Sequence, residues 1–302
     1  MMGWSWRHAF ESQLTIRLHR ITFEGYQGER IVFPRLYQTD EVVMHGYQLR
    51  RVTDDRFEVT HRRMGTQEFV RDVRGSGVAR LVRVRGESAS VDLTYDNHRR
   101  IERIQEHSNV LGTAPASYTM RYDEAGQLAE VWGARFGQPP ARLVRYHYNS
   151  GGHLVRAEDA AGACEAYSYD GLHRLTRATD RNGYAFGWEY DHEGRCAKTQ
   201  GEDGLWFAEF SYAPGTTTMK VHDGSAYTFT FDEDGVITEV VGPCGGVNKR
   251  IRDAAGRVLA EVDSSGRKIE FVYDEHGAWL RDATHLVTSS RRAWMPMAFP
   301  RP

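Results

Sequence analysis

The sequence has few cysteines, with three among 302 residues at Cys164, Cys196 and Cys244. The number is odd and no pair has C-x-x-C spacing, so we expect neither a disulfide framework nor a cysteine metal site. Long apolar runs are also missing, since no window approaches the roughly 18 uninterrupted apolar residues of a membrane-spanning helix. The amino-terminal stretch lacks the apolar core of a signal peptide. We therefore predict no membrane span and no signal-peptide-dependent export.

Neither sign of charge is in excess. Lysine and arginine number 39, aspartate and glutamate number 41, and the net charge is −2. Nucleic acids and anionic membranes attract proteins with a strong positive excess. The composition therefore predicts no nucleic-acid partner.

What the sequence does contain is a short phrase that recurs: an aromatic residue, then Asp or Asn, then usually glycine four positions after the aromatic. From Tyr148 onward the copies begin at positions 148, 169, 190, 212, 231, 252 and 273, so successive copies lie 19 to 22 residues apart. A period of this size indicates stacked structural units rather than one globular core. The residues that we assign to these turns are Tyr122, Asp123, Gly126, Tyr148, Asn149, Gly152, Tyr169, Asp170, Tyr190, Asp191, Gly194, Phe231, Asp232, Gly235, Asp253, Gly256, Tyr273, Asp274 and Gly277, with a weaker copy at Tyr95 and Asp96.

The Asp-x-x-Gly spacing predicts a type I turn followed by a left-handed residue. The aspartate side chain accepts hydrogen bonds from the turn amides, and glycine adopts a positive φ without strain. A second turn of this kind begins ten residues after the first, as at Asp180 after Asp170, which leaves about six or seven residues for each strand. Aromatic residues two apart, such as Tyr167 and Tyr169, share one face of a strand and form ladders between repeats. One repeat is therefore one β-hairpin, and the predicted fold is all-β.

We predict three regions along the chain. Residues 1–90 carry short β-type runs separated by glycines and form an antiparallel β region. Residues 91–282 hold about nine repeat hairpins of about 21 residues. Residues 283–302 include three prolines in the last seven positions, which favours an extended, flexible tail.

Motifs for catalysis or metal binding are weak. His192-Glu193-Gly194 lacks the second histidine of a zinc-protease helix. A calcium loop around Asp232 would need carboxylate ligands at its first and twelfth positions, but Thr230 and Val241 occupy them. The repeated aspartates could imitate an acidic site, but a catalytic pair occurs once, whereas this row recurs with every hairpin. We predict no catalytic residue, no metal and no cofactor, and leave open a triad assembled only in the folded chain.

The phrase Tyr-Asp-x-x-Gly-Arg-Leu at a period near 21 resembles the Rhs/YD-repeat family. The best matches are YDEAGQL from Tyr122, YDGLHRL from Tyr169, YDHEGRC from Tyr190 and RDAAGRV from Arg252, and the segment Gly3–His8 also looks like part of the Rhs architecture. The resemblance spans residues 3–282. It implies a spiralling, curved antiparallel sheet that forms a hollow shell around a carboxy-terminal toxin, as in polymorphic toxins that are often delivered by type VI secretion. Relatives include the insecticidal toxin-complex shell component and the teneurins.

The resemblance implies a non-enzymatic structural module, a fragment or short form of such a shell, acting in bacterial competition. Expected partners are a toxin domain or the remaining shell segments, with secretion-spike and chaperone proteins, and the expected location is cytoplasmic before delivery. Family toxins are commonly longer and end their core with an Asp-Pro-x-Gly-Leu segment that is not found here, so we expect a partial shell. The alternative is a surface module that binds glycans or a partner protein, because exposed aromatics such as Trp206 or Trp279 can stack on sugar rings.

Overall fold

The computed structural model describes residues 6, 8–37, 39–71, 77–108, 115–135, 138–233, 235–253, 256–273 and 279–282. Within these ranges every regular element is a β-strand, and the strands pair antiparallel as successive hairpins. The predicted all-β class is confirmed. No helix that could cross a membrane occurs in these ranges.

The chain divides into two compact units, residues 1–167 and 168–302. The strands of the first are β1 (Gln13–Ile16), β2 (Arg20–Glu24), β3 (Arg30–Pro34), β4 (Glu41–Met44), β5 (Tyr47–Arg51), β6 (Arg56–His61), β7 (Gly65–Arg71), β8 (Val78–Arg85), β9 (Ala89–Tyr95), β10 (Ile101–Ser108), β11 (Ala116–Tyr122), β12 (Leu128–Arg135), β13 (Ala141–Tyr148) and β14 (Leu154–Asp159), and β15 (Cys164–Tyr169) contains the boundary. The strands of the second are β16 (Leu175–Thr179), β17 (Ala185–Tyr190), β18 (Cys196–Gly201), β19 (Ala208–Ala213), β20 (Thr216–Val221), β21 (Ala226–Phe231), β22 (Ile237–Val241), β23 (Val247–Arg252), β24 (Val258–Val262), β25 (Lys268–Tyr273) and β26 (Trp279–Asp282).

The predicted limits at residues 90 and 282 mark where the sequence repeats begin and end, whereas the division at residue 167 separates compact units. The two limits stay predictions. The predicted tail, residues 283–302, lies outside the described residues.

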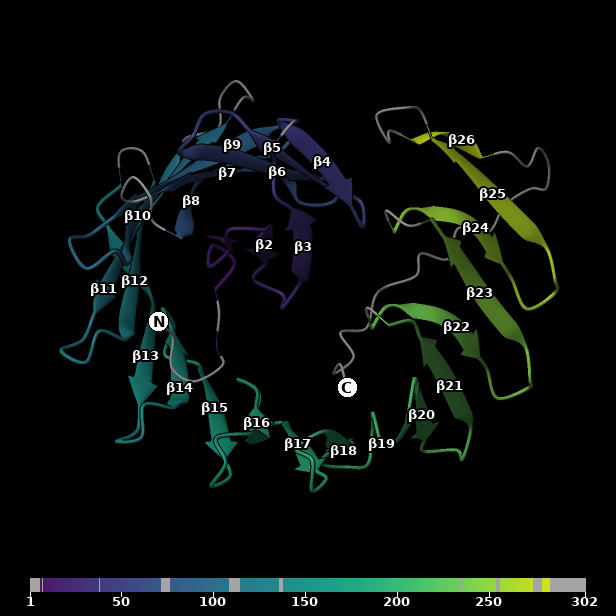
Figure 1. The fold of residues 1–302 in the computed structure, drawn as a ribbon. Helices are drawn as coiled ribbons and strands as arrows, with labels where there is room; N and C mark the ends of the chain where they lie inside the picture. Colours follow the sequence, from purple (N-terminus) through teal and green to yellow (C-terminus); the bar gives the residue numbers. More distant parts are fainter. Residues whose placement is uncertain are drawn as a thin grey trace. The chain divides into compact units, whose positions relative to one another are not determined.

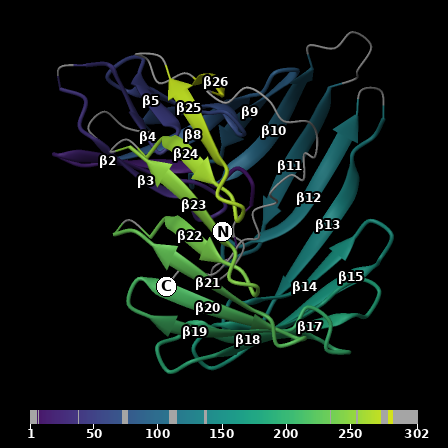
Figure 2. The ribbon, with the colours of Figure 1, turned by 90° about the vertical axis from the view of Figure 1, so that its right-hand side faces the viewer.

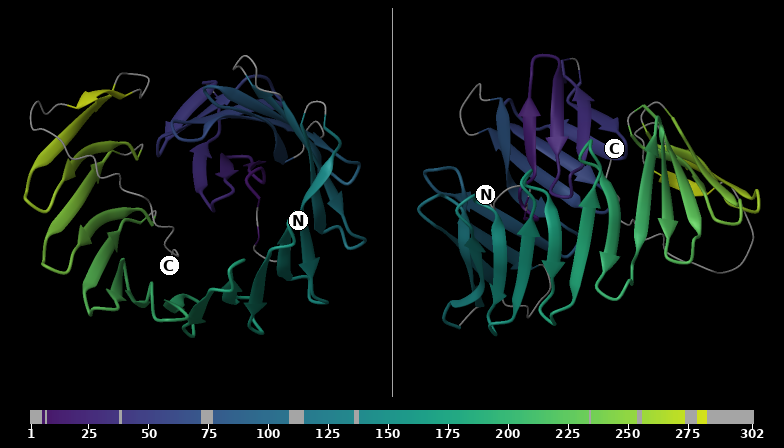
Figure 3. Two further views of the ribbon diagram at one scale, coloured as in Figure 1. Left: turned by 180° about the vertical axis from the view of Figure 1, so that it is seen from behind. Right: turned by 90° about the horizontal axis from the view of Figure 1, so that it is seen from below.

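In unit 1 the first three strands leave the simple order of the chain. The strands from β4 onward each pair with the next, but β1 pairs with both β2 and β8. Strand β8 places Ala79 opposite Leu14 of β1 and, further along, Val84 opposite Val91 of β9. The β1–β3 segment therefore branches from the sheet at β8, and β2 and β3 lie against the neighbouring strands (Figures 1 and 3).

The core of unit 1 sits between the β1–β3 segment and strands β5–β8. Alternation produces it: in β3, Ile31 and Phe33 are buried while Val32 is exposed. The Phe23 ring is fully buried, meets Phe69 edge to face with centroids 6.1 Å apart, and lies 5.5 Å from the ring of Tyr47. Burial of large apolar side chains is the dominant stabilising term, so this cluster anchors the unit.

Unit 2 is a regular meander in which each strand pairs with the next (Figure 2). Its buried cluster is small: Ala208, Met219 and Phe229. Most other apolar side chains of these strands are only half-buried. Stability here comes from contacts between neighbouring hairpins, as is typical of repeat proteins.

Candidate functional site

The repeat turns hold the residues that the sequence singled out, and the side-chain oxygen of an aspartate, or of Asn149 in one copy, accepts the amides of the turn. The backbone amides of Leu172 and Arg174 both donate to Asp170 Oδ1 at 2.9 Å. Equivalent bonds are accepted by Asp96, Asp123, Asn149, Asp191, Asp232 and Asp253, and in the second turns by Asp159, Asp180 and Asp263. The backbone hydrogen bond from Arg174, followed by the Arg174 side chain, holds the pKa of Asp170 below its usual value.

The position three residues after the aspartate has a positive φ. Glycine occupies it at Gly126 (79°), Gly152 (77°), Gly194 (82°), Gly235 (73°) and Gly256 (76°). Two copies have another residue there, His173 at 65° and Arg99 at 63°. The turn thus keeps its left-handed residue even without glycine.

We expect Gly194→Ala to lower the free energy of unfolding by about 1 kcal/mol, because alanine resists a φ of 82°. Space is not the cause, since an added Cβ would meet its nearest atom, Arg174 Nη1, at 3.7 Å. Gly171→Ala is the matched control: Gly171 lies in a repeat turn with nothing near an added Cβ and no positive φ. Urea unfolding of both variants checks the prediction, and equal losses would contradict it.

In four of the repeat turns, an arginine that follows the turn links one hairpin to the next. Arg174 Nε donates to Asp170 Oδ2 at 2.7 Å, and its guanidinium carbon lies 4.6 Å from the ring centroid of Tyr190. The Tyr190 hydroxyl in turn donates to the carbonyl of Leu175 at 2.6 Å. We call this arrangement the Asp–Arg–Tyr relay. The relay consists of a charge-assisted hydrogen bond between Arg174 and Asp170, a cation–π contact between Arg174 and Tyr190, and a hydrogen bond from Tyr190 to the backbone.

The relay recurs in both units. Its copies are Asp96, Arg100 and Tyr122; Asp191, Arg195 and Tyr212; and Asp253, Arg257 and Tyr273, with guanidinium-to-ring distances of 4.3, 4.4 and 5.3 Å. The ring contact was missed at the level of sequence. Its signal was the arginine that follows the turn in each of these copies.

Other copies replace the arginine. In the Asp123 turn, Gln127 Nε2 donates to the carbonyl of Gly152 at 2.9 Å, and in the Asn149 turn the buried His153 takes the position. The Tyr148 hydroxyl still donates to the carbonyl of Leu128 at 2.7 Å. Phe231 has no hydroxyl to donate.

Tyr169 ends strand β15 directly before the Asp170 turn. Asp274 and Gly277 lie outside the described residues.

The relay makes stability depend on pH at the alkaline end. Burial, and then the negative charge of Asp96, raise the pKa of Tyr122 to about 12 from an ordinary value of 10.0. A raised folded-state pKa gives stability that is complete below pH 10.0 and is lost as pH rises toward about 12. We expect Tyr122→Phe to weaken this alkaline loss, measured as the urea midpoint between pH 9 and pH 12. An unchanged pH profile would contradict it.

The turn carboxylates accept hydrogen bonds from the amides of their own turns and are spread along the repeats. In the part of the chain that the structure describes, no group of three or more His, Cys, Asp or Glu side chains could hold a metal ion. Trp206 differs from the half-buried tyrosines of the relay, because 76% of its surface is accessible, and its φ is 57°. The side chain of Trp279 is outside the described part.

The sequence profile of the RHS Repeat family matches residues 148–185 and 169–205, the region of the turns at Tyr148, Tyr169 and Tyr190. The chain is 28% identical over 199 residues to the probable deoxyribonuclease RhsB of Dickeya dadantii, covering 63% of this chain and 13% of that protein. The chain carries RHS repeats of this family. Its repeats build a structural β-sheet module.

A second relative is the double-stranded DNA deaminase toxin A of Burkholderia cenocepacia, 36% identical over 55 residues, which are 18% of this chain and 4% of that protein. The chain therefore spans a small part of both relatives. Among solved structures, the TcdB2–TccC3–Cdc42 crystal structure aligns with a TM-score of 0.41 at 12% identity, covering 92% of this chain and 19% of that one. The Photorhabdus luminescens Tc holotoxin pore with a TccC3 mutation aligns with a TM-score of 0.39 at 12% identity, covering 88% and 17%.

Proposed function

We propose that this Rhs chain is a non-enzymatic wall module of a toxin shell, which encloses or associates with a toxin domain. The observation that carries the proposal is the Asp–Arg–Tyr relay. It uses the repeated carboxylates, guanidiniums and phenols to hold each hairpin against the next, as a wall requires. A wall of hydrogen-bonded strands would separate a partly unfolded toxin from the cell that makes it.

The relatives suggest the kind of cargo. Their names describe a deoxyribonuclease and a DNA deaminase, and both proteins are much longer than this chain. We propose that the chemistry resides in a toxin outside this chain and that the partners are that toxin and further shell segments. Spike and chaperone proteins would bring the assembly, cytoplasmic before delivery, to a type VI apparatus for use against competing bacteria.

Co-expression with the products of neighbouring reading frames tests the proposal. We expect a tagged form of this chain to retain a toxin or shell polypeptide through affinity purification. The retained toxin should resist a protease that digests it when it is alone. Retention without protection would contradict enclosure, and no retention would contradict the shell role altogether. A catalytic activity of the purified chain on DNA would overturn the non-enzymatic assignment.

The alternative, a glycan-binding surface, is favoured by one observation. Trp206 presents 76% of its surface to solvent from a turn, which suits stacking on a sugar ring. Binding on a broad glycan array that Trp206→Ala abolishes would support this function. An array without signal would reject it.

A further inference from the structure

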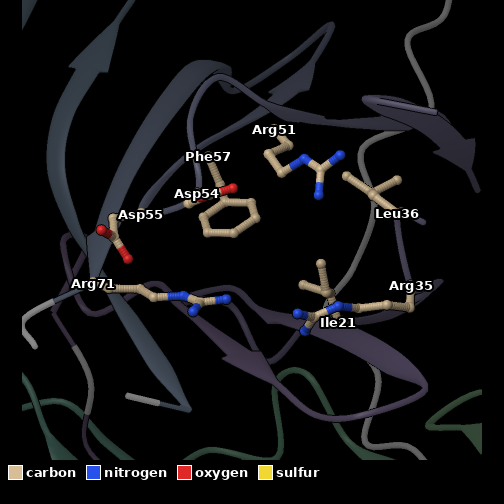
Figure 4. Close-up of a pocket in the computed structure, with 8 residues that line it drawn as sticks. All are labelled: Ile21, Arg35, Leu36, Arg51, Asp54, Asp55, Phe57 and Arg71. Carbon is tan, nitrogen blue, oxygen red and sulfur yellow. The ribbon is translucent and has the colours of Figure 1, made fainter. Parts of the chain in front are cut away.

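A pocket lies among the amino-terminal strands of unit 1 (Figure 4). Its volume is about 260 Å³, and its walls are Ile21, Arg35, Leu36, Arg51, Asp54, Asp55, Phe57 and Arg71. These residues come from β2, the segment after β3, the end of β5 with its following turn, the start of β6 and the end of β7. The pocket is separate from the repeat turns and is unrelated to the relay.

The floor of the pocket is apolar, because Ile21, Leu36 and Phe57 are almost completely buried. The three arginines differ in their partners. Arg51 is occupied: its Nε and Nη2 donate to Asp40 Oδ1 at 3.0 and 2.7 Å. Arg35 and Arg71 are available to a ligand.

Neither Arg35 nor Arg71 forms an ion pair with a carboxylate of the described residues. Arg35 Nη1 donates to the carbonyl of Arg17 at 3.1 Å. Arg71 lies over Phe57, 5.5 Å from the ring centroid, and its Nε is buried with no hydrogen-bond partner in the described part of the chain. Figure 4 shows the two guanidinium groups pointing toward each other.

This arrangement is incomplete as it stands. Two positive charges that face each other repel, and a buried donor without a partner costs free energy. An oxyanion between the guanidiniums removes the repulsion between them, because each planar fork can donate two hydrogen bonds to one anionic group. The apolar floor offers a contact for the rest of the ligand.

We propose that Arg35 and Arg71 bind the oxyanion of a small ligand, a carboxylate or a phosphate, whose apolar part rests on Phe57. The cavity holds roughly nine water-sized groups at about 30 Å³ each, enough for a small aromatic acid. Asp54 and Asp55 line the same pocket and repel negative charge. A singly charged carboxylate is therefore expected to bind more tightly than the phosphate dianion.

Isothermal titration of the whole chain tests the site with phenylacetate, its neutral amide and inorganic phosphate. We expect phenylacetate to bind and the amide not to bind. Arg35→Gln and Arg71→Gln should each weaken binding roughly ten- to a hundredfold. Asp54→Asn should strengthen binding by removing an exposed negative charge.

Arg56→Gln is the matched control, since Arg56 is an exposed arginine next to Phe57 that does not line the pocket. It should bind phenylacetate like the native chain. Tighter binding of phosphate than of phenylacetate would retain the oxyanion site and identify a phosphate-bearing ligand instead. The proposal would be overturned if neither anion binds at about 10 mM, a concentration about tenfold above the Kd of a weak, millimolar site. Equal weakening by Arg56→Gln would overturn it too. If Arg71→Gln fails to fold by circular dichroism, Arg35→Gln decides alone.

Discussion

Phe23→Ala is expected to lower the free energy of unfolding of unit 1 by about 3–5 kcal/mol, the usual cost of removing a buried aromatic ring. The Phe23 ring has no exposed surface and contacts both Phe69 and Tyr47. Its loss leaves a cavity where the β1–β3 segment meets β5–β8. Because β1 also pairs with β8, that cavity loosens the point at which this segment branches from the sheet.

Val32→Ala is the control for Phe23→Ala. Val32 lies on β3, which pairs with the strand of Phe23, but 40% of its surface is exposed. Its replacement should change stability by no more than about 0.5 kcal/mol. Urea unfolding followed by near-ultraviolet circular dichroism measures both. Similar losses for the two variants would mean that the buried cluster does not anchor unit 1.

The repeat hairpins could be predicted because their determinants are local. The aspartate of a turn and its left-handed residue lie within five positions, so Asp191 and Gly194 specify the turn without reference to the rest of the chain. The turns at Asp170 and Asp96 were found although they lack the glycine, and their His173 and Arg99 adopt the same positive φ. In those copies the carboxylates of Asp170 and Asp96 still accept the turn amides, which compensates for the strained residue.

The amino-terminal strands were recognised, but not their pairing. Their alternation indicates strands, yet nothing local shows that Leu14 lies opposite Ala79, far along the chain. The pocket could not be predicted for the same reason, since Arg35 reaches it from the segment after β3, and Arg51 and Arg71 from the ends of β5 and β7. The guanidinium-to-ring contact of the relay joins successive repeats and depends on their register, which a motif within one repeat does not contain.

Tyr148→Ala should cost unit 1 about 2–3 kcal/mol, and Tyr148→Phe only about 1 kcal/mol. The ring is half-buried, and burial raises the pKa of its hydroxyl. Phenylalanine keeps the ring and loses the hydrogen bond to the carbonyl of Leu128. Trp206→Ala, at a side chain that is 76% exposed, should leave stability nearly unchanged.

The two Tyr148 variants separate the contribution of ring packing to stability from that of the hydroxyl hydrogen bond. If ring packing dominates, Tyr148→Phe retains most of the stability; an equal loss in both variants would assign the stabilisation to the hydroxyl. Hairpins contact mainly their neighbours, so the damage should also be local. Hydrogen exchange should quicken in β12–β14 while β19–β22 keeps its protection. Faster exchange throughout both units would mean instead that the repeats unfold as one cooperative body.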